Sequence, residues 1–129
     1  IFFQSNNEGE IIDKIHEVND KFDGLIINPA AFTHSSIAIL DSLRAINKPK
    51  IEIHLSNIYA REEYRKKSIT SEGVNGIICG FGGNSYLQQH FAPSSQYIYI
   101  PTVLLAKSIA SWRALNSSWI LTERRKHVR

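Results

Sequence analysis

The sequence predicts an α/β domain built on a parallel β-sheet, with helices packed on both faces of the sheet. Short apolar, β-rich runs alternate along the chain with segments whose apolar residues recur at helical spacing. A chain of 129 residues suits one domain with a modest core, and its 43% hydrophobic and 21% charged composition is ordinary for a globular protein. No apolar run reaches the roughly eighteen residues of a membrane-spanning helix, so we expect no membrane partner.

The first part of the chain predicts two strand–helix units. "IFFQ" is a short apolar run, "DGLIIN" is a buried strand, and "SSIAILDSLRAI" is a helical stretch that opens on serine. The predicted elements are a strand at Ile1–Gln4, a helix from Ile11 to Phe22, a strand at Asp23–Asn28, a loop at Asn28–His34 and a helix at Ser35–Ile46.

The alternation continues after the break at "NKP". We expect a strand at Lys50–His54, a charged helical turn at Ala60–Lys67, a buried strand at Asn75–Gly82 and a further helix beginning at "NSYLQQHF". Cys79 lies in the apolar run "GIICGF" and is expected in the core; as the single cysteine it excludes an internal disulfide and a paired-cysteine metal site. Ligands of parallel α/β sheets bind beyond the carboxyl ends of the strands.

Residues 91–129 differ from the rest of the chain in charge. Residues 1–90 carry 9 Lys and Arg against 11 Asp and Glu, whereas residues 91–129 carry 6 against 1. We therefore divide the chain into an α/β domain at 1–90 and an extension at 91–129, in which Gln96–Ile100 is a candidate strand. The basic end "TERRKHVR" lies near Trp119, but such an end usually serves solubility, so we expect no nucleic-acid partner.

Glu52 and His54 are the first candidates for chemistry. Residues two apart on a strand point to the same face, and at the carboxyl end of the strand that face opens on the ligand crevice. A carboxylate beside an imidazole favours the protonated imidazolium, which is the form that a general acid needs. The alternative is a half-exposed histidine that makes a structural hydrogen bond.

Other polar groups are expected at the same crevice. Asn28 ends a strand with an amide that can donate and accept, although Asn-Pro is also ordinary turn chemistry. His34 stands at the entry of a helix, where it could equally be a surface residue. The backbone N–H groups of Leu55 and Ser56 directly follow a strand and suit an anion.

Three charged residues complete the set. Arg61 and Arg65 lie four apart, on one face if the segment is helical, and could clamp a hydroxylated or anionic ligand; the alternative is a solvated charged face. Asp41 is placed in mid-helix, where an aspartate is usually solvated. Since the set includes no obvious nucleophile and no metal-binding motif, it fits acid–base chemistry on a small polyhydroxylated acid.

The residues at this crevice resemble those of a known family. The stretches "FFQSNNEGEIIDKIHE", "DGLIINPAAFTHSSIAILDSL", "IEIHLSNIYAREEYRKKS" and "GIICGFGGNSYL" are closely similar to the type II 3-dehydroquinate dehydratases. The similarity runs in order through residues 1 to about 90, about 70% of the chain, and the combination "INPxAxTH … IExHLSNxxAREExR" is highly specific.

The resemblance implies a flavodoxin-like three-layer fold and trimers assembled into a homododecamer. It implies a cytoplasmic lyase that removes water from 3-dehydroquinate by anti elimination through an enolate, in quinate metabolism or the shikimate pathway of aromatic amino acid biosynthesis. The family uses no metal, cofactor or Schiff base.

The family motif also implies a role for each candidate residue. His54 would be the general acid that protonates the departing hydroxyl, and Glu52 would orient it. Asn28 would hold a water or the substrate near the developing enolate. The remaining residues would bind the substrate carboxylate (Leu55, Ser56), bind ring hydroxyls (His34, Arg65), reach a neighbouring subunit's site (Asp41) and support the site and its lid (Arg61).

Two departures from the family pattern leave the activity open. The family opens with a first strand, an "NGPNLN"-type loop and a lid that carries an arginine and the tyrosine base, and none of these precedes Ile1. The tail offers a strand-like stretch with Tyr97 and Tyr99, but no such loop follows it, which disfavours a first unit moved to the other end. The alternative to a working dehydratase is therefore a non-catalytic fragment or relic that keeps the substrate crevice.

Overall fold

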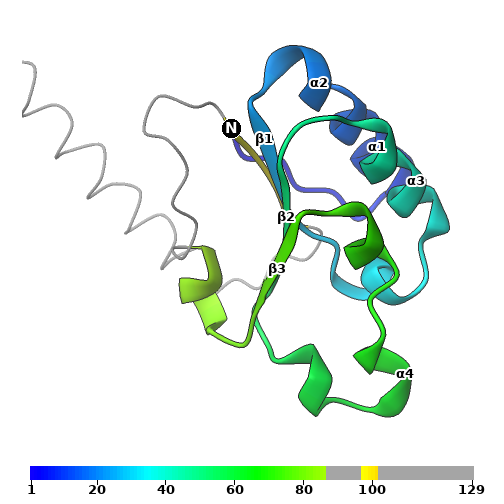
Figure 1. The fold of residues 1–129 in the computed structure, drawn as a ribbon, viewed down its shortest axis with the longest axis vertical. Coiled ribbons are helices and arrows are strands. Elements are labelled where there is room, and N and C mark those ends of the chain that lie inside the picture. The colour runs from blue at the N-terminus through cyan, green and yellow to red at the C-terminus, as the bar shows by residue number, and fades with distance from the viewer. Residues whose placement is uncertain (87–96, 102–129) are drawn as a thin grey trace, which may run out of the picture.

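Four parallel strands form one sheet in the order β3–β2–β1–β4 (Figure 1). The structure is a computed structural model that describes residues 1–86 and 97–101. The strands are β1 (Gly24–Asn28), β2 (Lys50–His54), β3 (Gly76–Cys79) and β4 (Tyr97–Pro101). The predicted parallel α/β sheet is confirmed, and the predicted bounds of β2 are those observed.

The helices lie mainly on one side of this sheet in the described part of the chain (Figure 1). They are α1 (Glu8–His16), α2 (Val18–Lys21), α3 (Ile37–Ala45) and α4 (Glu63–Lys66), with short 3-10 turns η1 (Ala30–His34), η2 (Ile58–Ala60), η3 (Thr70–Gly73) and η4 (Gly82–Tyr86). The Asn7 side chain caps α1, and Ser36 caps α3 by accepting from the Ile39 N–H at 2.9 Å. None of these helices is both long enough and apolar enough to cross a membrane.

The core lies between the sheet and the pair α1 and α3. Ile11, Ile15, Leu25, Ile39 and Leu43 are fully buried there. All five residues of β1 are buried, as expected for an inner strand of a parallel sheet. The apolar periodicity that predicted the helices therefore marks the side chains that meet in this core.

Several predicted elements differ in the structure. The strand predicted at Ile1–Gln4 is wrong, since only Phe2 forms an isolated bridge and Ile1 is 73% exposed. The first helix starts earlier than predicted, at its Asn7 cap, and is divided at Glu17. Cys79 is half-buried rather than in the core, because β3 lies at the edge of the described sheet. The helix predicted from "NSYLQQHF" begins as the turn η4 and otherwise lies outside the described residues.

Strand β4 comes from the tail and pairs with the edge of β1 opposite β2. The register runs from Gly24↔Tyr97 to Asn28↔Pro101, and Ile98 and Ile100 are buried in the core. A flavodoxin-like sheet places the first strand of the fold beside the third, which is the position that β4 takes here. The tail strand thus satisfies N–H and C=O groups that would otherwise be unpaired along β1. The division into 1–90 and 91–129 stays a prediction.

Gly73 allows η3 to pack closely against α3. A Cβ added at Gly73 would lie 2.9 Å from Leu43 Cβ and 3.0 Å from Leu40 Cδ1. We expect Gly73→Ala to lower the free energy of unfolding by about 1–3 kcal/mol, the usual cost of overpacking. The measurement is denaturant unfolding beside Gly76→Ala, where the new Cβ has open space. Equal stability of the two variants would contradict the close packing of η3.

Candidate active site

Asn28 and His54 end two neighbouring strands, so they open on the same edge of the sheet. His54 Nε2 lies 2.6 Å from Glu52 Oε1, and the two side chains are 6% and 0% exposed. The prediction that both side chains share one face of β2 is confirmed. The pair is also more buried than the half-exposed structural histidine that was the alternative.

The Glu52 carboxylate is held by three donors. Besides His54, Ser68 Oγ donates to Oε1 at 2.8 Å and Thr70 Oγ1 donates to Oε2 at 2.6 Å. A carboxylate taken out of water is very costly unless it is hydrogen-bonded or paired. The two hydroxyls and the imidazole satisfy both oxygens, so the acid can be buried beside His54.

This arrangement defines which nitrogen of His54 is available for proton transfer. An ionised carboxylate can only accept a hydrogen bond. Nε2 of His54 is therefore the nitrogen that carries the proton in its contact with Glu52. The nitrogen left for a ligand is Nδ1. In the imidazolium form Nδ1 carries the proton that a general acid would transfer.

Asn28 ends β1 in a strained turn. Its Oδ1 accepts from the Ala30 N–H at 3.1 Å, and its Nδ2 donates to the Tyr86 hydroxyl at 3.3 Å. Ala30 has φ 51°, in the left-handed region that is unfavourable for residues with a Cβ. Backbone strain of this kind concentrates at functional sites, and here the adjoining loop carries His34.

His34 is fixed by the backbone rather than by another side chain. Its Nδ1 lies 2.7 Å from the Lys67 carbonyl oxygen, which can only accept, so Nδ1 is the protonated nitrogen of this contact. This contact does not use Nε2, which stays a candidate for binding a ligand. The side chain is half-buried at the end of η1, so the alternative of a surface residue stays open.

The glycine-rich turn after β3 fixes the chain that leaves β2. The Gly80 N–H and the Ser85 hydroxyl donate to the His54 carbonyl, at 3.3 and 3.2 Å, and the Gly82 N–H donates to the Leu55 carbonyl at 2.9 Å. Gly80 and Gly82 have positive φ, as a tight turn requires. Leu55 and Ser56 therefore follow the strand directly, and their N–H groups stay candidates for an anion.

The predicted helical face of Arg61 and Arg65 is wrong. Arg61 is extended (φ −99°, ψ −172°) and caps η2, whereas Arg65 belongs to the separate helix α4. Arg65 stacks 5.4 Å from the Tyr64 ring and lies 3.9 Å from Glu62. A charged segment with no buried face has no packing to hold it in one continuous helix.

Asp41 is exposed on α3, and the described residues do not bring it to the carboxyl edge of the sheet. Sequence reasoning missed three residues that the structure adds to the site: Ser68, Thr70 and Tyr86. The "SIT" stretch offered only its i, i+2 hydroxyls as a signal, because its partner Glu52 lies 16 and 18 residues away.

Burial raises the pKa of the Tyr86 phenol above its ordinary value of 10.0, and this outweighs the hydrogen bond from Asn28, which acts in the opposite direction. The phenol therefore stays protonated near neutral pH. A pKa that is higher in the folded state makes the stability contribution of the phenol complete below about pH 10 and lost as the pH rises further.

The free energy of unfolding of the wild type should fall as the pH rises from about 10 to the folded pKa of Tyr86. We expect this fall to be smaller in Tyr86→Phe, as measured by urea unfolding across that range. Tyr64→Phe, at a position 70% exposed, is the control. An unchanged alkaline slope in Tyr86→Phe would contradict the burial of the phenol.

The chain is thus an α/β protein with a buried carboxylate–imidazole pair at the carboxyl edge of its parallel sheet, an arrangement suited to acid–base chemistry. Residues 1–91 match the family described as dehydroquinase class II, and the chain belongs to that family. The flavodoxin-like fold expected from the family resemblance is thereby confirmed.

Related proteins agree with this assignment. The chain is 62% identical over 86 residues to 3-dehydroquinate dehydratase of Clostridium botulinum (strain 657 / Type Ba4), covering 67% of this chain and 58% of the relative. It is 58% identical over 88 residues to the protein of that name from Caldicellulosiruptor saccharolyticus, covering 67% and 61%. The chain thus spans about three fifths of the length of these relatives.

Solved structures show the same similarity. The type II dehydroquinase of Butyrivibrio crossotus matches with a TM-score of 0.63 and 49% identity, covering 65% of this chain and 59% of the other. That of Propionibacterium acnes matches with a TM-score of 0.60 and 44% identity, covering 62% and 59%.

Proposed function

We propose that this chain carries the site of a 3-dehydroquinate dehydratase, a hydro-lyase that converts 3-dehydroquinate to 3-dehydroshikimate. The observation that supports it best is the buried Glu52–His54 pair, 2.6 Å apart at the carboxyl edge of the sheet. A histidine whose proton is placed by a neighbouring carboxylate suits general acid catalysis. The family and the names of the relatives agree with this chemistry.

In the proposed reaction a base removes the proton next to the substrate ketone, and the electron pair forms an enolate. The enolate then collapses to a conjugated alkene while the C–O bond of the leaving hydroxyl breaks. His54 gives that oxygen a proton, so the group departs as water. The base passes its proton to solvent, from which His54 is protonated again. Asn28, at the end of β1, would lie near the developing enolate.

Binding of the substrate would use the groups around this pair. The substrate carboxylate would accept hydrogen bonds from the backbone N–H groups of Leu55 and Ser56 and from the Ser56 hydroxyl. His34 would bind a ring hydroxyl through Nε2, since its Nδ1 is held by the Lys67 carbonyl. Arg65 would bind a second hydroxyl, and Arg61 would support the site.

A second candidate function is binding of 3-dehydroquinate without turnover. In this candidate the site lacks a base: Tyr86, the phenol that contacts Asn28, has its pKa raised by burial and is not a base near neutral pH.

One experiment separates the two candidates. The chain is mixed with 3-dehydroquinate, the conjugated product is followed by ultraviolet absorbance, and binding is measured by calorimetry. Product formation supports the dehydratase, and binding without product supports the second candidate. Folded protein that neither binds nor converts 3-dehydroquinate would overturn both.

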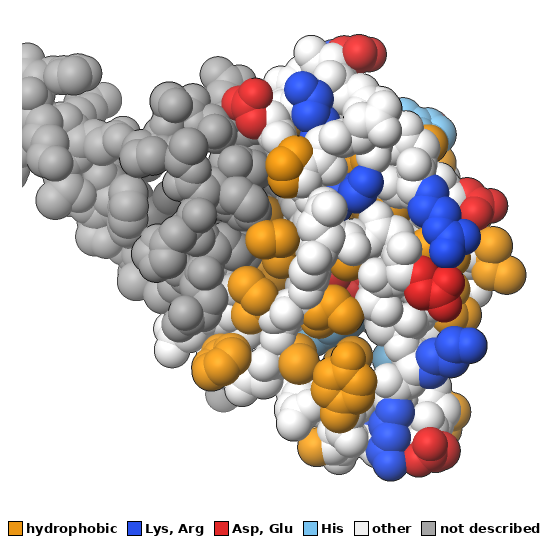
Figure 2. Space-filling model, viewed as in Figure 1, with side chains coloured by type: hydrophobic (Ala, Val, Ile, Leu, Met, Phe, Trp, Pro, Cys, Tyr) orange, Lys and Arg blue, Asp and Glu red, His pale blue; other side chains and the backbone are white. Residues whose placement is uncertain are grey.

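We also propose a cytoplasmic homo-oligomer, built from trimers as in a dodecamer. Figure 2 shows apolar side chains gathered over β3, and Ile77 in that strand and Phe81 after it are 37% and 60% exposed. Exposed apolar patches of this kind mark interaction surfaces. Asp41, which is exposed on α3, would then meet a neighbouring subunit. Light scattering that gives the mass of a monomer would overturn the assembly.

A further inference from the structure

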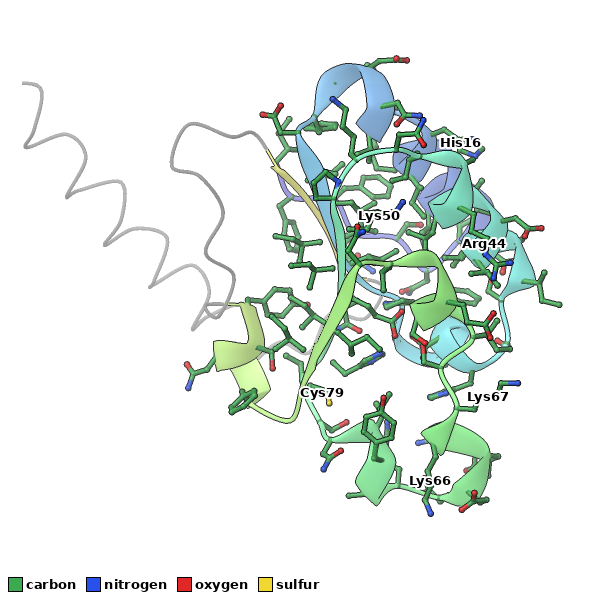
Figure 3. The ribbon with its side chains drawn as sticks, viewed as in Figure 1. His16, Arg44, Lys50, Lys66, Lys67 and Cys79 are labelled. Atoms are coloured by element: carbon green, nitrogen blue, oxygen red, sulfur yellow. The ribbon has the colours of Figure 1, made fainter. Side chains whose placement is uncertain are left out.

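The segment from Lys67 to Thr70 contacts two residues of the proposed site, His34 and Glu52, together with the backbone of Thr33. Lys67 gives its carbonyl to His34 Nδ1 at 2.7 Å, and the hydroxyls of Ser68 and Thr70 bind the two oxygens of Glu52. The Ile69 N–H donates to the Thr33 carbonyl at 2.7 Å. These four consecutive residues connect η1, β2 and η3, and Figure 3 shows Lys67 beyond α4 on the path toward η3.

The two hydroxyls are placed for this contact by their own neighbours. The Ser71 N–H donates to Ser68 Oγ at 3.0 Å, which leaves the Ser68 proton directed at Glu52. Thr70 is fully buried, with its Oγ1 3.4 Å from Thr33 Oγ1, so the Thr33 hydroxyl can donate to Thr70 while Thr70 donates to Glu52. Gly73 lets the rest of η3 pack closely on α3.

Ser68 and Thr70 affect His54 indirectly, because they bind Glu52 and Glu52 contacts His54. The Glu52 carboxylate would otherwise be able to rotate about its terminal bond, because that torsion has no strong staggered preference. With Ser68 on Oε1 and Thr70 on Oε2, the orientation of the carboxylate is fixed and Oε1 is directed at His54 Nε2. The histidine is then held in one orientation, with Nδ1 left for the ligand.

We propose that Ser68 and Thr70 are positioning residues of the acid–base site, which act by fixing Glu52 and, through it, the tautomer and orientation of His54. The Lys67 carbonyl does the same for His34. The proposal rests on the proposed function for its catalytic meaning, but its structural claim can be tested without turnover.

The first test reads the imidazole of His54 directly. Nitrogen-15 NMR of labelled chain reports which ring nitrogen carries the proton, and the His54 signals are assigned by their loss in His54→Gln. In the neutral ring we expect Nε2 to carry the proton in the wild type. Thr70→Val, which removes the hydroxyl and keeps the shape, is expected to give a mixture of both tautomers. Thr70→Ser, which keeps the hydroxyl, is expected to restore the wild-type spectrum.

The second test uses turnover. We expect Thr70→Val to lower kcat for 3-dehydroquinate by about 10-fold, which corresponds to the loss of one hydrogen bond to a charged group worth about 1.4 kcal/mol, with KM changed less. Ser68→Ala is expected to act in the same direction. Ser71→Ala is the matched control, because its hydroxyl binds the Ser68 carbonyl and not Glu52.

The outcomes distinguish the dehydratase activity from the positioning role of Ser68 and Thr70. Absence of turnover in the unchanged chain as well as in every variant, with the tautomer changed in Thr70→Val, would reject the dehydratase and keep the positioning role. An unchanged tautomer in both Thr70→Val and Ser68→Ala would overturn the positioning role, whatever the turnover. Equal losses in Thr70→Val and Thr70→Ser would also overturn it, since the hydroxyl would then not matter. If Thr70→Val does not fold, Ser68→Ala and Thr70→Ser decide.

Discussion

Replacing His54 with alanine is expected to lower the rate of 3-dehydroquinate turnover by about 10²–10⁴-fold, the range that a positioned general acid contributes. The physical reason is that the hydroxyl would leave without a proton, because Glu52 lies behind the imidazole and is fully buried. Binding should change far less than the rate, since the N–H groups after β2 are backbone groups that the substitution keeps. The measurement is initial velocity across a range of substrate concentrations.

His16→Ala is the control for this prediction. Figure 3 shows His16 at the end of the molecule away from Cys79, the last residue of β3, so its loss leaves the carboxyl edge of the sheet intact. A His54→Ala variant that turns over 3-dehydroquinate as fast as the His16→Ala variant would mean that the histidine of the pair is structural.

Placing a charge at Ile100 is expected to unfold the chain. Ile100 is 1% exposed in β4 and packs in the core with the side chains of α1 and α3. An unpaired carboxylate buried there costs several kcal/mol, while the whole stability of a domain is only about 5–15 kcal/mol. Ile100→Asp should therefore show no cooperative unfolding transition by circular dichroism, or one at much lower temperature.

The matched variant is Ile37→Asp, the same substitution at a position 64% exposed on α3. It should change stability by no more than about 0.5 kcal/mol. Similar behaviour of the two variants would contradict the pairing of the tail strand with β1.

The parts of the fold that the sequence predicted well are those fixed by local pattern. Polar and apolar residues alternate in the run "KIEIH", and β2 has the predicted bounds. The Glu52–His54 contact also follows locally, because a strand sets residues two apart on one face. The helix predicted at Ser35–Ile46 was expected to open on a serine, and Ser36 caps α3.

The parts that could not be predicted depend on partners far away in the sequence. A strand at Ile1–Gln4 would need a neighbouring strand to pair with, and apolar composition alone does not show whether one is present. Only Phe2 forms a bridge there. Strand β4 was only a candidate, since its place beside β1 is decided by packing of Ile98 and Ile100 into the core. Arg61 and Arg65 were placed on one helix because the spacing is helical, but the exposed segment bends between them.

The same limit explains the missed residues of the site. Ser68 and Thr70 reach Glu52 only after the chain has passed through α4 and returned toward the sheet. No local pattern distinguishes these hydroxyls from surface ones. Their assignment comes from the burial of Glu52, because a buried carboxylate must find donors somewhere in the fold.

The central claim is that the carboxyl edge of β1 and β2 is the binding site for 3-dehydroquinate. Hydrogen–deuterium exchange of the chain with and without saturating 3-dehydroquinate tests it most directly, because the result depends on where the ligand lies and not on turnover. We predict protection in peptides that cover 28–34 and 54–56, with α1 unchanged. Protection confined to other segments, or none at saturation, would contradict the assignment of the site.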